Sequence, residues 1–475
     1  MVTGFRSRTT LNPNPKNGIG ILQFLQAKNY FITGATGFLG KVLVEKLLRT
    51  VPNVGKIFVL IQAKDQEAAL RRLKSEIINS ELFKCIKQIQ GSSYEDFMLS
   101  RLVPVVGNIC EPNLGMHNDV ALEIAREVDQ PILRLMRAYV NGKRQGNVME
   151  KPLYEGETIA KEKCLYSKNS VPSNLDVDAE IRICSTSKFV SEDNEQTQAM
   201  KEMGIKRAKL YGWQNTYEFT KAMGEMIINS EREDVPLVIL RPSIIQSTFQ
   251  DPFPGWIEGN RMADPLILNY GRGLLPAFVG NAKTVIDVIP VDMVVNALIA
   301  AIAKHGIARK PGIKVYHVAS SLVNPLEVGD MFNYSSEYFD SSPMVDLNGR
   351  RKRGIEKMKF ISSVEEFSKY IWAETSQEMG LNGDNNILDA KGFERLQIKC
   401  RKRVNHALHL AKIYEPYMFY GAWFDNGNIQ KLMEEMSEEE RQSFNFDVEC
   451  VVWKHYITKI HVRGLEKQVK KQRDA

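Results

Sequence analysis

In the first third of the chain, short continuous apolar runs alternate with stretches in which apolar residues recur at helical spacing. Tyr30–Ile32 is a short run of residues that favour strands, and apolar side chains then recur at helical spacing over residues 42–48. Lys56–Gln62 and Leu102–Asn108 have the composition of two more buried strands, and residues 66–101 between them look helical and largely solvated. This order predicts a parallel sheet with helices on its faces.

The alternation of strand and helix continues to about Asn324 and then stops. Before that point we expect helices at Leu210–Glu231 and Met293–Ala303 and strands at Val235–Pro242 and Lys314–Ser320. After it we expect mainly helices, at Ser363–Trp372, at Val404–Tyr414 (ending before Pro416) and at Ile429–Met436, with an exposed loop at Asp384–Asn386.

These elements predict an α/β protein with a Rossmann-like, doubly wound parallel sheet and a smaller, mainly helical C-terminal domain. We place the NAD(P)-binding, Rossmann-type domain at residues 1–325 and the helical domain at residues 326–475. The basic end, Lys467–Arg473, is expected to be a solvated tail.

The spacing after the third strand is too short for a complete sheet. Only 28 positions separate Asn108 from Met136 (136 − 108), and a turn and a helix at Asp119–Val128 already occupy part of them. A βαβ unit takes roughly 30 residues or more. Two further strands with a helix between them do not fit, so we expect the sheet to lack part of its central strands.

The segment that follows the first strand has the glycine spacing of a dinucleotide-binding turn. Gly34 permits a tight turn, Gly37 lets the backbone approach a pyrophosphate, and Gly40 lets the following helix pack close to the strand. A turn without a ligand is the alternative, but the strand before and the helix after favour binding. The predicted cofactor contacts in this turn are Thr33, Gly34, Thr36, Gly37, Phe38, Leu39 and Gly40.

Two other strand ends are predicted to contact the same cofactor. The second strand ends at Gln62, where an acidic residue would favour a free ribose 2′-hydroxyl and a cation would favour a 2′-phosphate. Lys64 is such a cation and favours NADPH, and Arg71 and Arg72 follow further on. Asn108, at the end of the third strand, is expected near the adenine.

Tyr217 and Lys221 stand one helical turn apart and form the candidate catalytic pair. An ammonium beside a phenol favours the phenolate, so the tyrosine can pass a proton to a carbonyl oxygen as hydride reaches the carbon. Lys221 can also bind the nicotinamide ribose. By itself this spacing more often marks an amphipathic helix face, but downstream of the glycine turn it favours catalysis.

A serine or threonine hydroxyl usually completes this arrangement, and none stands in the expected place. The five residues before Ala138, Leu133–Arg137, include no hydroxyl. Ser185, Thr186 and Ser187 lie too near a charged insertion to be assigned.

Composition excludes several other classes of protein. The net charge of +6 over 475 residues is small and no nucleic-acid module is present, so no nucleic-acid partner is expected. The six cysteines form no CxxC pair, which favours reduced thiols, and no metal site is predicted. We expect no secretory signal and no transmembrane helix, although the first 26 residues are faintly similar in composition to a transit peptide. Any membrane contact is expected to be peripheral.

Longer strings resemble one family over nearly the whole chain from about Asn17. The glycine turn, the Tyr217/Lys221 pair and Leu240–Ser243 resemble the extended short-chain dehydrogenase/reductases. Other strings resemble the plant alcohol-forming fatty acyl-CoA reductases, which carry a C-terminal "male sterility" domain. They are Ala63–Ala69, Val105–Cys110, Ala138–Gly142, Tyr211–Glu225, Asp251–Asn260 and Tyr456–Leu465.

The resemblance implies a two-step reduction of a long-chain acyl-CoA to a primary alcohol with two NADPH. It implies that Gly34, Gly37 and Gly40 contact the pyrophosphate, that Tyr217 donates the proton, and that Lys221 assists it. It also implies a location in the cytosol or at the cytoplasmic face of the endoplasmic reticulum.

Three departures from the family pattern indicate an impaired enzyme. Met136 and Arg137 stand where the pattern has Ser-Thr, Gln62 stands where it has an arginine, and a block holding the fourth strand and a following strand is missing. A spliced-out exon or a faulty gene model would remove such a block. The alternatives are a catalytically inactive protein that binds nucleotide or acyl-CoA, and a sugar-nucleotide epimerase, which does not explain the C-terminal domain.

Overall fold

Two three-stranded parallel sheets form the centre of the fold in the computed structural model, which describes residues 18–128, 132–135, 138–142, 144–160, 174–186, 194–344, 356–381 and 390–474. In the first sheet the order is β1 (Tyr30–Ile32), β2 (Ile57–Ile61) and β3 (Leu102–Val106). In the second it is β10 (Ile313–Val318), β6 (Leu237–Pro242) and β4 (Ile132–Leu135). Every pairing is parallel, as predicted for the α/β class.

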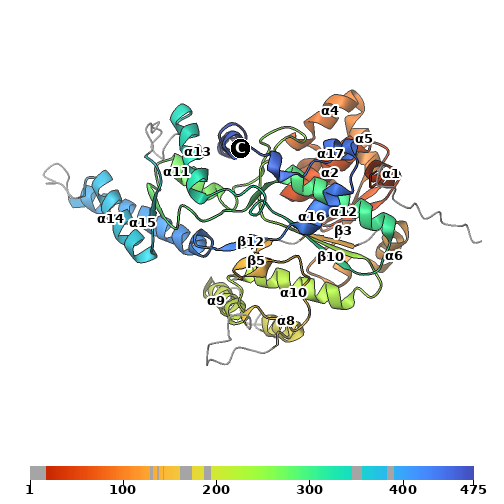
Figure 1. The fold of residues 1–475 in the computed structure, drawn as a ribbon, viewed down its shortest axis with the longest axis horizontal. Coiled ribbons are helices and arrows are strands. Elements are labelled where there is room, and N and C mark those ends of the chain that lie inside the picture. Colours follow the sequence, from red (N-terminus) through yellow and green to blue (C-terminus); the bar gives the residue numbers. More distant parts are fainter. Residues whose placement is uncertain are drawn as a thin grey trace, which may run out of the picture.

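Helices cover both faces of these sheets, as the doubly wound arrangement requires (Figure 1). One face carries α2 (Phe38–Thr50), α12 (Val291–Ala308) and α16 (Gly427–Glu434). The opposite face carries α10 (Thr216–Glu231), with α8 (Val177–Thr186) and α9 (Asn194–Leu210) beside it. The strands between them are apolar because both of their faces are buried.

The centre of the sheet is interrupted between β1 and β4. Among the described residues, β1 pairs only with β2, and β4 pairs only with β6. This agrees with the expectation that the sheet lacks part of its central strands. One short strand, β4, forms after α6 (Asn118–Glu127), although the resemblance to the family implied that both strands of the block are missing. Four residues are enough for a short strand, whereas the spacing leaves no room for a second strand and its helix.

Residues 66–101 are more buried than predicted. They form α3 (Gln66–Arg72), the π-helix η1 (Leu73–Ile78), η2 (Glu81–Phe83), α4 (Lys84–Gln90), η3 (Gly91–Ser93) and α5 (Tyr94–Arg101). The expectation of a largely solvated segment is wrong, because Leu73, Ile77, Leu82, Phe83 and Met98 are fully buried in the main core. α4 and η2 contact α2 directly.

The C-terminal part is mainly helical, as predicted, but it also adds strands to the N-terminal part. Its helices include α13 (Val328–Ser341), α14 (Val364–Glu378), α15 (Ala390–Met418) and α17 (Glu438–Ser443). β11 (Lys359–Ile361) pairs with β8 (Ala277–Val279), and β12 (Ala422–Phe424) pairs with β5 (Gly146–Val148). One hydrophobic core includes side chains from both parts, and the division at residue 325 stays a prediction.

The remaining elements are short. They are α1 (Ile21–Leu25), η4 (Pro112–Gly115), η5 (Ala138–Asn141), β7 (Ile244–Gln246), α11 (Asp264–Gly271), β9 (Val288–Pro290), η8 (Val448–Cys450), α18 (Trp453–His455), the π-helix η9 (Tyr456–His461) and α19 (Val462–Asp474). β7 pairs with β9 in a separate two-stranded sheet.

Two expectations about the C-terminal part are wrong. α15 does not end before Pro416 but continues to Met418. The lost backbone hydrogen bond is offset by contacts of the final turn, where the Met418 carbonyl accepts from Thr284 Oγ1 at 2.8 Å. Lys467–Arg473, expected as a solvated tail, belongs to α19, which is anchored by buried Val462 and Leu465. The expected loop at Asp384–Asn386 lies outside the described residues.

α12 is the most apolar long helix of the core. Of the helices described, it alone is long and apolar enough to cross a membrane by length and composition, and 72% of it is buried inside the protein. Most of its side chains pack in the main core, which is the behaviour of a core helix.

Candidate active site

The glycine turn lies between β1 and α2, where the sequence predicts it. Gly34 has φ +70°, a conformation that favours glycine, and the Gly37 N–H donates to the Gly34 carbonyl at 3.0 Å. Gly37 is the N-cap of α2 and has extended backbone geometry. The first N–H groups of α2 therefore stand at the end of β1, and Thr33 and Gly34 are exposed there.

Gly40 makes the close approach that the sequence predicts for it. A Cβ atom at Gly40 would lie 2.7 Å from Ala35 Cα and would also collide with the Gly34 carbonyl oxygen. At Gly37 a Cβ atom would lie 3.2 Å from the same oxygen. These missing side chains leave the turn and the helix N-terminus open to a phosphate group, so the residues present fit a dinucleotide.

The ends of β2 and β3 lie beside each other at the same edge of the first sheet. Ile61 pairs with Val106, and the Gly107 N–H donates to the Ile61 carbonyl at 3.2 Å. Gln62 and Asn108 therefore follow neighbouring strands toward the cofactor edge. Asn108 stabilises its own loop, since its Nδ2 donates to Glu111 Oε1 at 2.7 Å and its Oδ1 accepts from the Cys110 N–H at 3.1 Å.

Two cations stand near the end of β2. The Lys64 side chain is 79% exposed and lies 3.8 Å from Asp65, so it is free to reorient. Arg72 is a second cation that spacing alone did not assign: its Nη1 donates to the Gln62 carbonyl at 2.6 Å while its Nε contacts Glu76 at 2.6 Å. The position of Arg72, about one helix length after Gln62, could be read from the sequence. Its hydrogen bond to the Gln62 carbonyl could not.

Tyr217 and Lys221 lie together on α10, as predicted. The Lys221 ammonium lies 5.6 Å from the centre of the Tyr217 ring, and the tyrosine side chain is half exposed. The ammonium and the phenol are therefore neighbours on one helix face. The pair lies on α10, the helix that precedes β6 of the second sheet. The glycine turn follows β1 of the first sheet and leads into α2, which covers the face opposite to α10 (Figure 1).

Buried hydrogen bonds hold the start of α10 in place. Asn215 caps the helix by accepting from the Glu218 N–H at 2.9 Å, and its Nδ2 donates to Tyr417 Oη at 2.8 Å. The Tyr417 hydroxyl donates to Glu218 Oε1 at 2.7 Å. The Trp213 indole N–H donates to the Val140 carbonyl at 2.7 Å, which holds η5 against this helix.

The position of the catalytic hydroxyl directly precedes η5. Met136 and Arg137, which occupy that position, lie outside the described residues, as does Ser187. Ser185 and Thr186 end α8, and the Ser185 hydroxyl is exposed and donates to the Ile181 carbonyl at 2.9 Å. The hydrogen bond from Trp213 holds η5, which directly follows this position in the sequence, beside the helix of the catalytic pair.

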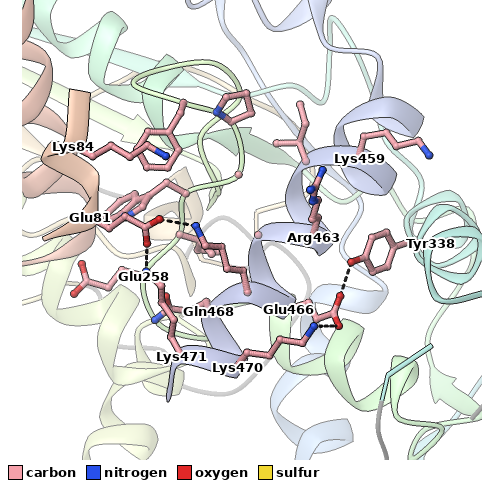
Figure 2. Close-up of a pocket in the computed structure, with 18 of the residues that line it drawn as sticks. Glu81, Lys84, Glu258, Tyr338, Lys459, Arg463, Glu466, Gln468, Lys470 and Lys471 are labelled. Atoms are coloured by element: carbon pink, nitrogen blue, oxygen red, sulfur yellow. Dashed lines mark hydrogen bonds and ion pairs between the residues drawn. The ribbon is translucent and has the colours of Figure 1, made fainter. Parts of the chain in front are cut away.

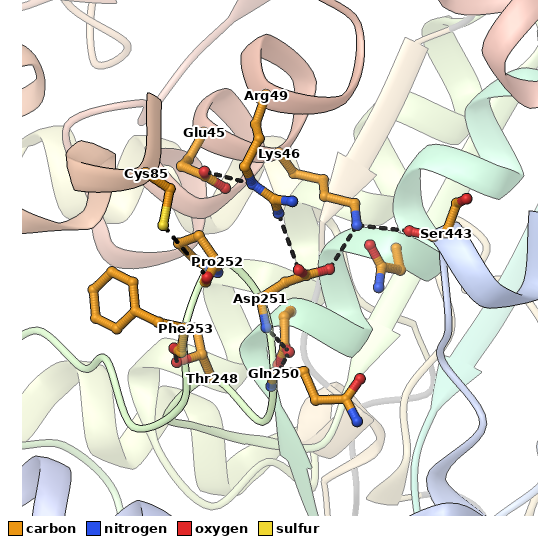
Figure 3. Close-up of polar contacts among 12 residues, drawn as sticks. Glu45, Lys46, Arg49, Cys85, Thr248, Gln250, Asp251, Pro252, Phe253 and Ser443 are labelled. Carbon is orange, nitrogen blue, oxygen red and sulfur yellow. Dashed lines mark hydrogen bonds and ion pairs between the residues drawn. The ribbon is translucent and has the colours of Figure 1, made fainter. Parts of the chain in front are cut away.

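The loop after β7 connects α2 to α12 through ion pairs and hydrogen bonds (Figure 3). Asp251 contacts Lys46 at 2.7 Å and Arg49 at 3.2 Å. Burial raises the pKa of Asp251, but the two cations outweigh this effect and hold it below its usual value. Asp292 of α12 accepts from three consecutive backbone N–H groups of the same loop, at 2.8, 2.8 and 2.9 Å.

The same loop continues past the first turn of α2. Trp256 stacks on Phe38 with ring centres 5.4 Å apart, and Glu258 contacts Lys41 at 2.7 Å. Phe38 and Leu39 were predicted as cofactor contacts, and the Phe38 ring is occupied by this packing. The Phe38 ring is therefore not available to a cofactor, and the contact predicted for Phe38 stays a prediction for its backbone N–H at the start of α2.

The parallel sheets, the helices on both faces and the glycine turn define the class as a Rossmann-like α/β fold. The reductase (R) domain of a non-ribosomal peptide synthetase from Mycobacterium tuberculosis has a similar fold, with a TM-score of 0.53 at 15% identity over 95% of each chain. The terminal R domain of the myxalamid biosynthetic pathway gives a TM-score of 0.51 at 13% identity, over 94% of this chain and 92% of that one. At these identities the likeness concerns the fold alone.

The sequence comparisons are more specific. The family described as "Male sterility protein" matches residues 32–132 and 136–298 with its NAD-binding part and residues 393–472 with its C-terminal part. "Fatty acyl-CoA reductase 2, chloroplastic" of Arabidopsis thaliana is 46% identical over 501 residues, which cover 96% of this chain and 81% of that protein. "Alcohol-forming fatty acyl-CoA reductase" of Simmondsia chinensis is 33% identical over 495 residues, which cover 94% and 98%.

The chain belongs to the male sterility family of fatty acyl-CoA reductases. It is therefore an oxidoreductase-family protein with a domain for a nicotinamide cofactor. The match to the NAD-binding part is interrupted at residues 133–135, which lie within the short interval between Asn108 and Met136.

Proposed function

We propose that this protein is built to reduce a long-chain acyl-CoA to a primary fatty alcohol with two NADPH, and that a missing internal segment impairs it. The observation that carries the proposal is the Tyr217–Lys221 pair, adjacent on α10 in a chain of this family that also has an open glycine turn. One NADPH would supply hydride to the thioester carbon, and the carbon–sulfur bond would break to release the thiol of coenzyme A and leave the aldehyde. A second NADPH would supply hydride to the aldehyde carbon.

The chain's own residues would handle the proton and the position of the substrate. Tyr217 would donate its hydroxyl proton to the carbonyl oxygen, and the Lys221 ammonium would stabilise the phenolate left behind. The backbone N–H groups at the start of α2 would hold the pyrophosphate. The exposed Lys64 supports NADPH over NADH, since it can approach a ribose 2′-phosphate, and Arg72, which is bonded to the Gln62 carbonyl and to Glu76, adds positive charge near the same strand end.

The proposed defect lies between β1 and β4. No strand bridges these two among the described residues, the family match breaks at residues 133–135, and the alignment to one relative spans 501 positions against the 475 residues of this chain. Unpaired strand edges at this place would also promote aggregation. The competing proposal is a catalytically inactive protein that still binds nucleotide or acyl-CoA, and it rests on the missing hydroxyl at Met136 and Arg137.

The proposed location is the cytosol or the cytoplasmic face of the endoplasmic reticulum, with only peripheral membrane contact. One relative has "chloroplastic" in its name, which makes a plastid the rival location. A fluorescent fusion of the full chain in leaf cells tests the two, because plastid fluorescence would contradict the proposal and a reticular or diffuse pattern would support it.

The activity is tested by expressing three chains in yeast and measuring fatty alcohols by gas chromatography. The first is the unaltered chain, the second restores the missing segment from a related sequence, and the third adds Tyr217→Phe to the second. Of these three chains, we expect alcohol from the second only. A Tyr154→Phe variant of the repaired chain is the matched control, because Tyr154 is also about half exposed and lies outside α10.

Each other outcome identifies a different error. Alcohol from the unaltered chain would show that another hydroxyl replaces the lost one. Full activity of the Tyr217→Phe chain would refute the proposed proton donor. No alcohol from the repaired chain would favour the binding-only alternative. Comparing NADPH with NADH as the reductant for the purified repaired chain tests the cofactor.

A further inference from the structure

A cavity of about 870 Å³ lies between the C-terminal helix and the loop that covers the start of α2 (Figure 2). Its walls come from η2 and α4, from residues 253–258, from the end of α13, and from η9 with α19. This volume is typical of a small-molecule site. Tyr217 and Lys221 do not line it, so it is separate from the catalytic pair.

The lining of this cavity is strongly cationic. Three carboxylates face six cations, which leaves a formal excess of three positive charges (6 − 3); the cations are Lys84, Lys459, Arg463, Lys467, Lys470 and Lys471. An excess of this kind in a concave site attracts anions and focuses their field.

Each carboxylate of the lining is already neutralised. Glu81 pairs with Lys467 and Lys471, and Glu258 pairs with Lys41. Glu466 contacts Lys470 at 2.8 Å and accepts from the Tyr338 hydroxyl at 2.6 Å.

Three of the cations, Lys84, Lys459 and Arg463, form no ion pair within the part of the chain that the structure describes. The Lys84 ammonium lies 3.4 Å from the centre of the Phe253 ring, so Lys459 and Arg463 are the two cations left for a ligand. Figure 2 shows Arg463 between the Glu81 group and the Glu466–Tyr338 pair. A guanidinium in this position can bind a phosphate through two parallel hydrogen bonds.

Close backbone packing makes the wall of the cavity rigid. A Cβ atom at Gly255 would lie 2.9 Å from the Ile460 carbonyl oxygen, and one at Gly464 would lie 2.9 Å from the Gly255 carbonyl carbon. The loop and the C-terminal helix therefore meet without intervening side chains. Lys459 and Arg463 directly precede Ile460 and Gly464 in the chain, so this contact holds their backbone at a fixed place relative to the loop.

The cavity shares a wall with the cofactor edge. Trp256 and Glu258 line the cavity, and the same residues contact Phe38 and Lys41 in the first turns of α2. An anionic ligand in the cavity and a dinucleotide at the glycine turn would therefore occupy neighbouring sites on the two sides of one loop.

We propose that this cavity binds the phosphate-bearing nucleotide end of coenzyme A, with Arg463 and Lys459 as the ligands of its phosphates. The inference rests on the proposed function, which requires an acyl-CoA beside the nicotinamide cofactor. The 3′-phosphate and the diphosphate of coenzyme A supply the negative charge that the excess cations require. The cavity also offers the Phe253 ring, over which the Lys84 ammonium lies, as an aromatic surface in the same site.

The test is isothermal titration calorimetry of the full chain, which needs binding but no turnover. Coenzyme A, dephospho-coenzyme A and NADPH are titrated into the unaltered chain and into Arg463→Ala, Lys459→Ala and Arg463→Lys. We expect Arg463→Ala to weaken coenzyme A binding about tenfold or more, since it removes a charge-assisted hydrogen bond, and to leave NADPH binding unchanged. Arg463→Lys should restore part of the affinity.

A matched control separates this site from general charge effects. Lys399→Ala removes one positive charge from an exposed position on α15, away from the cavity, and should bind coenzyme A like the unaltered chain. Circular dichroism of each variant checks that the fold is retained. The unaltered chain should bind dephospho-coenzyme A more weakly than coenzyme A. In Arg463→Ala this difference between the two ligands should disappear.

Equal affinity of Arg463→Ala and the unaltered chain for coenzyme A would overturn the inference. NADPH binding without coenzyme A binding would overturn it and leave the nicotinamide site standing, whereas binding of neither ligand would overturn the proposed function as well. Binding to vesicles with anionic lipids, without binding to coenzyme A, would mean that the cations contact a membrane and that the assignment is wrong.

Discussion

Gly40 offers the most direct test of how the glycine turn and α2 create a cofactor site. Substitution by alanine adds one methyl group at a place where its carbon would lie 2.7 Å from Ala35 Cα and would collide with the Gly34 carbonyl oxygen. Both obstacles are backbone atoms and cannot rotate away. The helix N-terminus must therefore move away from the turn by roughly half an ångström or more before the contacts become ordinary.

The cost of this movement has a definite order of magnitude. Forcing an extra methyl group into a well-packed place costs about 1–3 kcal/mol. If the whole cost appears in binding, the dissociation constant for NADPH rises by about 5- to 150-fold. If part of it appears in folding, the midpoint of unfolding falls instead. The sum of the two losses should lie in this range, because both report the same displacement of α2.

The assay combines calorimetric titration of NADPH with urea unfolding of Gly40→Ala and of a control. Gly427→Ala is the control, because Gly427 also stands in the first turn of a helix, α16, and its added carbon would lie 3.4 Å from Asp425 Oδ1, an ordinary contact. We expect the control to bind NADPH normally and to be as stable as the unaltered chain or slightly more stable. Normal NADPH affinity and stability in Gly40→Ala would refute the close-packing role of this glycine.

Three further predictions concern the contacts that hold the site. Asp292→Asn should lower the free energy of unfolding by about 2–3 kcal/mol, because a neutral amide cannot replace the carboxylate that accepts three backbone N–H groups. Urea unfolding measures this loss, and an unchanged urea midpoint would contradict the prediction. Burial raises the pKa of Glu150 to about 7, so the folded state keeps a proton that the unfolded state loses above about 4.5. This group's contribution to stability is therefore present below pH 4.5 and is lost as the pH rises through 7. Glu150→Gln should flatten the plot of unfolding free energy against pH between these values, and the exposed control Glu155→Gln should not. Tyr417→Phe should cost about 1–3 kcal/mol in the same urea assay by removing the hydrogen bond to the buried Glu218, and a loss below 0.5 kcal/mol would show that water replaces the hydroxyl.

Local features of the site were readable from the sequence. The turn at Gly34–Gly40 depends on backbone freedom and on the strand and helix directly beside it, so three glycines at fixed spacing are enough to predict it. The Tyr217–Lys221 pair depends only on helical geometry, which puts residues four apart on one face. The short interval between Asn108 and Met136 is a covalent constraint, and it predicted a deficit at the centre of the sheet.

Contacts between distant parts of the chain could not be read in this way. β12 pairs with β5 across more than 270 residues, and Arg72 meets the end of β2 only because α3 folds back along β3. Such contacts depend on which surfaces are buried together, and many sequences are compatible with each of them. For the same reason Pro416 was tolerated inside α15, where tertiary contacts outweigh a local preference.

The sequence by itself determined the chemistry of the two local motifs, the family resemblance and the shortage of residues at the sheet centre. Only the tertiary structure decided that one central strand, β4, still forms against β6, because strand pairing is a contact between segments about a hundred residues apart. It also decided that the basic C-terminal end folds as a helix against the loop that covers α2, because the burial of Val462 and Leu465 outweighs the solvation of the lysines beside them.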